Sequence, residues 1–140
     1  MGTWSASPFG SDSALDLLDQ FSDVEEGQRA EFLEQIFRAG LSGPADGAIG
    51  KVLPDEVIAA AAILAASLPG GQEFPWNQDV DDILLPSVSR SGFELPVLAL
   101  RALRHVIPDG GWWWRSWKDE RDAEQMRAAL NQIEGVLLTA

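Results

Sequence analysis

The chain has 140 residues, of which 46% are hydrophobic and 23% charged, and it contains no cysteine. These fractions are typical of a globular domain. They exclude collagen-like, fully disordered and disulfide-stabilised chains, and the lack of cysteine excludes thiolate sites. The 22 acidic and 10 basic residues give a net charge of −12, which disfavours binding to nucleic acid or to an anionic membrane surface.

The chain shows no recognisable targeting segment. Its N-terminal stretch lacks the basic region and the long apolar run of a signal peptide, and Ala6 stands where a myristoylation signal requires Ser or Thr. The longest uncharged apolar run, residues 57–68, has 12 residues, too few to span a bilayer. We therefore expect a cytoplasmic protein, and the length suits a single helical domain over residues 1–140.

A first helix is predicted from Ser11 or Asp12, either of which can cap its N-terminus, to about Ser22. One stripe of this helix is apolar at helical spacing, and acids lie off the stripe. The apolar stripe consists of Leu15, Leu18 and Phe21, and the acids are Asp16 and Asp19.

A second helix is predicted from about Val24 to Ala39. Its apolar face consists of Leu33, Ile36 and Phe37. Gly40 is expected to end it, because glycine readily takes the left-handed conformation that closes many helices. The glycine-rich segment that follows is predicted to be a loop.

A third helix is predicted to begin at Pro54, because proline suits the first helical position and the acids Asp55 and Glu56 follow it. It is expected to run to Leu68 and to stop at Pro69. Its sequence is apolar nearly all round and rich in alanine, which favours a central helix covered on every side.

Two more helices complete the prediction. One starts near Phe93-Glu94 and reaches Val106, and the last runs from about Trp112 or Ser116 to Leu138. The last helix has an apolar stripe consisting of Met126, Leu130, Ile133 and Leu137. No segment alternates as a strand does. The predicted fold class is therefore all-α, a single compact bundle of five to six helices around the central alanine-rich helix.

The N-terminal motif resembles a known family. Met1-Gly2-Thr3-Trp4, Pro8-Phe9 and the segment Asp12–Asp16 match the opening of the bacterial domain of unknown function 4259 family, with serines at positions 5 and 7 in place of the usual glycines. The alanine-rich helix and the late tryptophans also fit. The resemblance implies a helical bacterial domain without an assigned activity, and some members are candidates for toxin-immunity roles.

The two aromatic residues of this motif have two interpretations. Trp4 and Phe9 flank a short turn ahead of the first helix, where they can pack against the bundle as an enlarged hydrophobic staple. Alternatively, Trp4, Phe9 and Asp12 line a ligand pocket. The sequence leaves both interpretations open.

Two acidic pairs at i, i+3 spacing are candidate metal ligands: Asp16 with Asp19, and Glu31 with Glu34. All-α phosphohydrolases of nucleoside triphosphates hold Mg²⁺ with pairs of this spacing. Helical geometry, however, turns Glu31 and Glu34 away from the apolar face and puts Glu34 one turn from Arg38. We therefore expect a solvated, ion-paired face.

A further acidic cluster, at residues 79–82, resembles the start of a calcium loop. Leu84 and Arg90 stand where such a loop needs glycine and glutamate, so only an acid-rich helix N-terminus is expected. His105, the single histidine, has no nucleophile at a recognisable spacing. We predict no catalytic residue, no metal site and no cofactor.

The N-terminal stretch is strongly acidic and contains no lysine or arginine between Met1 and Gln28. Its acids are Asp12, Asp16, Asp19, Asp23, Glu25 and Glu26. Such a stretch attracts a positively charged surface. These six residues are therefore candidates for an interface with a basic protein partner.

Four tryptophans lie close together: Trp112, Trp113 and Trp114 are consecutive, and Trp117 follows. In a helix Trp113 lies about 40° from Trp117 and Trp114 about 60° on the other side, so these three can share one buried face. Trp112 lies about 140° away. It either folds back over the preceding glycine turn or anchors a binding interface.

Together these features favour a non-catalytic, acidic, helical binding protein, in its most concrete form an immunity-type inhibitor of a basic toxin. The interface candidates are the six acids and Trp112. The alternative is a metal-dependent all-α phosphohydrolase that uses the acidic helix pairs, and a third hypothesis is a structural or regulatory domain. The oligomeric state is left open.

Overall fold

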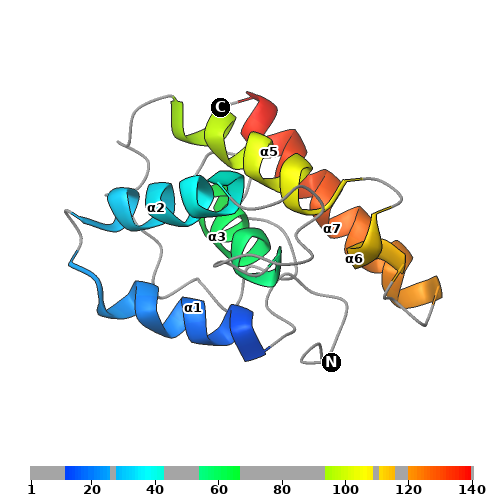
Figure 1. Cartoon of the computed structure of the whole chain (residues 1–140), viewed down its shortest axis with the longest axis horizontal. Coiled ribbons are helices and arrows are strands. Elements are labelled where there is room, and N and C mark those ends of the chain that lie inside the picture. Colours follow the sequence, from blue (N-terminus) through cyan, green and yellow to red (C-terminus); the bar gives the residue numbers. More distant parts are fainter. Residues whose placement is uncertain are drawn as a thin grey trace.

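A computed structural model describes residues 12–25, 28–42, 54–66, 94–108, 111–115 and 120–139. These residues form six helices and no strand, which confirms the predicted all-α class for this part of the chain (Figure 1). The helices are α1 (Asp12–Asp23), α2 (Arg29–Ser42), α3 (Pro54–Ala66), α5 (Glu94–Val106), α6 (Trp112–Arg115) and α7 (Glu120–Thr139).

The central element is α3, as predicted. Every side chain from Val57 to Ala65 is at most 1% exposed. A helix that is apolar on all sides is stable only when neighbours cover it completely. Here α1, α2, α5 and α7 all contact α3, and Figure 1 shows α3 between α1 on one side and the α5–α7 pair on the other.

Helix α1 has nearly the predicted bounds, and Leu18 and Phe21 of its predicted stripe are buried as expected. Leu17 and Phe21 are buried, whereas Leu15, which was predicted to lie on the apolar stripe, is 40% exposed. The prediction for Leu15 is therefore wrong. Leu17 lies about 40° from Phe21 around the helix and Leu15 about 120° from it, so only Leu17 can share the face that Phe21 turns toward α3.

Helix α2 begins at Arg29 rather than near the predicted Val24. Val24 instead closes the end of α1, where its N–H donates to the Phe21 carbonyl oxygen (3.2 Å). The Arg29 side chain donates from Nε to the Val24 carbonyl oxygen (2.9 Å) and from Nη2 to the Ser22 carbonyl oxygen (3.3 Å). A cation on the last carbonyls of a helix is favourable, and here it joins α2 to α1.

Gly40 was predicted to end α2, but this prediction is wrong, because the helix continues to Ser42. Gly40 is buried, and a Cβ atom added to it would lie 3.0 Å from Cγ2 of Val57 and 3.6 Å from Cγ1 of Val106. The lack of a side chain therefore lets α2 come close to both α3 and α5.

The described C-terminal helices agree with the prediction. Helix α5 has the expected bounds, and of the predicted last helix the structure describes α6 and α7, with residues 116–119 outside the described ranges. The apolar stripe of α7 is buried as predicted: Met126, Leu130, Ile133 and Leu137. At the α5–α6 junction the Gly111 N–H donates to the Pro108 carbonyl oxygen (2.9 Å).

Some sequence-based predictions concern residues outside the described ranges. They are the roles of Trp4, Phe9, Glu26 and Trp117 and the acidic cluster at 79–82. Within the helices of the described ranges, none is both long enough and apolar enough to cross a membrane.

Candidate functional site

The outward side of α1 carries a row of acids. Because Leu17 and Phe21 hold the opposite side against the core, Asp16, Asp19 and Asp23 point outward, and all three are exposed. They fall within about 60° of one another around the helix. Glu25, just beyond the helix end, is exposed as well. We call these four residues the acidic face.

The acidic face is not neutralised by the rest of the described structure. None of its four carboxylates forms an ion pair or a hydrogen bond with another described residue. The nearest cation in the chain, Arg29, binds the backbone carbonyls at the end of α1 and lies over the Phe21 ring, with its guanidinium carbon 5.3 Å from the ring centroid. The Arg29 guanidinium therefore stabilises the end of α1 and does not pair with the carboxylates of the acidic face.

Three other predicted interface residues are not described in the same detail. Asp12 and Trp112 are the first residues of α1 and α6, but their side chains lie outside what the structure describes, as does all of Glu26. Their roles in an interface stay predictions. Helix α6 lies beside α5 and α7 rather than beside α1 (Figure 1), so a partner that touches both Trp112 and the acidic face must cover more than α1.

The acidic pairs considered as metal ligands face outward. Asp16, Asp19 and Glu31 are exposed, and Glu34 is half-buried with its Oε2 atom 3.3 Å from Nε of Arg38. In the described ranges no three His, Asp or Glu side chains come together as a possible metal site. These pairs therefore lie on the solvent-facing sides of their helices, and the phosphohydrolase alternative stays a prediction.

Two neighbouring tryptophans of α6 differ in their surroundings. Trp113 is 5% exposed, and its Nε1 donates a hydrogen bond to Oδ1 of Asp55 (3.2 Å) in the first turn of α3. Trp114 is half-buried and packs edge-on against Trp113, with ring centroids 4.8 Å apart. Burial of Trp113 confirms its predicted core role, but Trp114 is only partly in the core.

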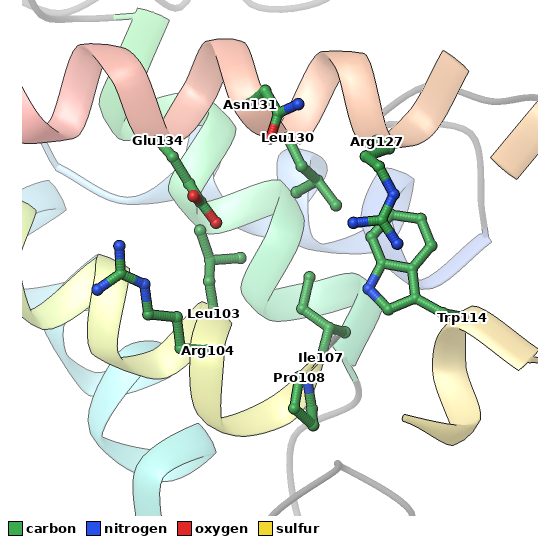
Figure 2. Close-up of a pocket in the computed structure, with 9 residues that line it drawn as sticks. All are labelled: Leu103, Arg104, Ile107, Pro108, Trp114, Arg127, Leu130, Asn131 and Glu134. Atoms are coloured by element: carbon green, nitrogen blue, oxygen red, sulfur yellow. The ribbon is translucent and has the colours of Figure 1, made fainter. Parts of the chain in front are cut away.

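Trp114 instead lines a pocket between α5, α6 and α7, with a volume of about 440 Å³ (Figure 2). The lining residues are Leu103, Arg104, Ile107, Pro108, Trp114, Arg127, Leu130, Asn131 and Glu134. Sequence reasoning missed this pocket. Arg104 and Arg127 are 23 positions apart on different helices, and no local pattern indicates that they border one space.

The pocket has an apolar floor and polar walls. Leu103, Ile107 and Leu130 are at most 8% exposed and form the floor. At one end the Arg127 guanidinium lies over the Trp114 ring, with its carbon 4.3 Å from the ring centroid. At the other end Arg104 of α5 and Glu134 of α7 extend from facing helices (Figure 2).

Several polar groups in the pocket have no partner among the described residues. Trp114 Nε1 points toward the pocket (Figure 2) and makes no hydrogen bond there, and Arg104, Asn131 and Glu134 make neither hydrogen bonds nor ion pairs with described residues. An N–H that faces an open pocket can exchange water for an oxygen atom of a ligand. The pocket therefore offers hydrogen-bonding groups to a ligand.

Comparison with known proteins assigns the chain to a family. No curated protein and no solved structure matches it. A family model does match, over residues 2–129, and this range includes α1, α2, α3, α5 and α6 and the first half of α7. The resemblance that the N-terminal motif suggested is thereby confirmed, and the chain belongs to the family named for its domain of unknown function, DUF4259.

Proposed function

We propose that this protein is a non-catalytic binding protein that holds a basic partner protein on the acidic face of α1, in the manner of an immunity-type inhibitor of a basic toxin. One observation carries the proposal. Four exposed carboxylates lie together on one helix and its end, without an ion pair to any other described residue.

The electrostatics of the acidic face suit the capture of a positively charged surface. Asp16, Asp19 and Asp23 extend along a helix of 12 residues, which is about 18 Å long. At physiological salt their field reaches about 8 Å into solution. A row of like charges raises the association rate of an oppositely charged protein and disfavours acidic competitors.

The acidic face is also held in place before any partner arrives. Ala14, Leu17 and Phe21 are at most 1% exposed and pack α1 against the core, while Arg29 fixes the end of the helix. A partner therefore does not have to order this surface, and that lowers the entropic cost of binding. Leu15, 40% exposed and one turn before Asp19, adds an apolar contact within the row.

The test compares two variants that remove equal charge from different places. One is Asp16→Asn/Asp19→Asn/Asp23→Asn on α1. The other is Glu31→Gln/Glu120→Gln/Glu124→Gln, which neutralises exposed acids of α2 and α7. Proteins retained by the wild type from a lysate of the source cells are identified, and the association rate of the purified partner is measured at several salt concentrations.

We expect the α1 variant to bind the partner about tenfold more slowly than the wild type and to lose most of the salt dependence. The α2/α7 variant should keep most of both. Equal slowing by the two variants would show that only net charge matters. A partner whose association rate does not change with salt would contradict the proposal.

A further inference from the structure

The α5–α6 side of the molecule has a charge opposite to that of the chain as a whole. Helices α5 and α6 contain three exposed arginines and one acid, whereas the net charge of the protein is −12. The arginines are Arg101, Arg104 and Arg115, and the acid is Glu94. Arg127 and Glu134 of α7 border the same region, so the pocket lining carries two arginines and one acid. A local positive potential in a negative protein favours an anion at this place.

We propose that the pocket between α5, α6 and α7 binds a small organic anion, with its acidic head group at Trp114 and Arg127 and its apolar body on Leu103, Ile107 and Leu130. This inference does not depend on the proposed function of α1. The ligand class follows from three properties of the pocket: its donors, its preorganised arginine and its apolar floor.

The first property is the donor that Trp114 offers. Its neighbour Trp113 donates Nε1–H to Asp55, as a buried indole normally does, but Trp114 Nε1 faces the pocket without an acceptor from the described residues. A carboxylate or phosphate oxygen at this end of the pocket would accept that hydrogen bond.

The second property is the position of Arg127. Its guanidinium rests on the face of the Trp114 ring, a contact that orients the side chain before a ligand binds. Stacking uses the face of the guanidinium, and a guanidinium has five N–H donors along its edge. Arg127 can therefore contact an anion in addition to its present neighbours.

The third property is the shape of the pocket. A volume of about 440 Å³ lies within the range of small-ligand sites, which combine an apolar lining with a few polar groups. The floor of Leu103, Ile107 and Leu130 requires a ligand with an apolar body rather than a free inorganic ion. At the far end Glu134 offsets the attraction of Arg104 for a negative group, so the head group is oriented toward Trp114 and Arg127.

Three naphthalene compounds test the inference: 2-naphthoate, 2-naphthyl phosphate and neutral 2-naphthamide. They share one apolar body, so differences among them report the head group, and the two anions distinguish a carboxylate from a phosphate. Binding is followed by the indole N–H signals in nitrogen–proton NMR spectra, in which Trp114→Phe identifies the Trp114 signal by its disappearance.

We expect at least one anion to bind about tenfold more tightly than the amide, because a charge-assisted hydrogen bond is replaced by a neutral one. The Trp114 signal should shift on binding, and the Trp113 signal should shift less. Trp114→Phe, which keeps a ring but removes the donor, should weaken anion binding about fivefold.

Arg127→Gln should weaken anion binding about tenfold. Its control is Arg115→Gln, which removes the same charge from an exposed residue that does not line the pocket and should change affinity less than twofold. Both residues are exposed, so both variants should fold. Equal losses in the two variants, equal affinity for anion and amide, or no binding of either anion at about 10 mM would overturn the inference.

Discussion

The two charged regions of this protein differ in sign and in shape. The acidic face of α1 is convex, formed by one helix, and carries Asp16, Asp19, Asp23 and Glu25. The pocket between α5, α6 and α7 is concave and has Arg104 and Arg127 in its walls. The net charge of −12 alone does not reveal that the two regions differ in sign. An exposed row of charges suits a large partner surface, whereas a hollow with an apolar floor suits a small molecule.

The difference in shape arises from how each region packs on α3. Helix α1 lies against α3 through one apolar face, so its polar face projects outward. Helices α5 and α7 run antiparallel beside each other, with α6 across their end (Figure 1). The pocket lies between these three helices, and the residues that border it come from all three.

The largest expected effect comes from the helix that supports both regions. Ile63 in α3 is 1% exposed, so Ile63→Asp would bury an unpaired carboxylate at a cost of about 4 kcal/mol or more. We expect the protein to unfold and to lose the acidic face and the pocket in the same transition. Circular dichroism during thermal unfolding measures the effect. A melting temperature within a few degrees of the wild type would disprove the central role of α3.

Alanine substitutions at two glycines should change the free energy of unfolding by a smaller amount. One of these glycines is closely packed and the other lies on open surface. Gly40→Ala would put a Cβ atom 3.0 Å from Cγ2 of the fully buried Val57 and should destabilise the fold by about 1–3 kcal/mol. Gly135→Ala, with nothing within 4 Å of the added atom, should stabilise α7 by about 0.5–1 kcal/mol.

Urea unfolding of the two glycine variants measures both changes. If Gly40→Ala does not lower the free energy of unfolding, α2 does not approach α3 and α5 as closely as described. Gly40 would then be explained better as a helix end.

The smallest effects separate the two adjacent tryptophans. Trp113→Phe removes the hydrogen bond to Asp55 from a buried position and should lower the free energy of unfolding by about 1–3 kcal/mol. Trp114→Phe removes a donor that has no acceptor among the described residues and should change it by about 0.5 kcal/mol or less. Calorimetry of both variants checks this order, and the reverse order would assign Trp114 to the core rather than to the pocket.

The helices themselves were predictable because their signals are local. Pro54 followed by two acids starts α3 where it was expected, and the all-round apolar character of residues 57–65 makes that helix central. The stripe that ends at Leu137 was also predicted, since it repeats with the helical period. The acids of α1 were recognisable in the same way, because an outward position follows from the apolar face opposite them.

What could not be predicted depends on which helices meet. Gly40 has the sequence pattern of a helix end, but Val57 and Val106 come within reach of it only after α2, α3 and α5 have packed. Leu15 and Leu17 are equally apolar, and the position of α3 buries only Leu17. Arg104 and Arg127 become neighbours of one pocket because α5 and α7 lie side by side. Periodicity describes one helix at a time, and a pocket between three helices is a property of their arrangement.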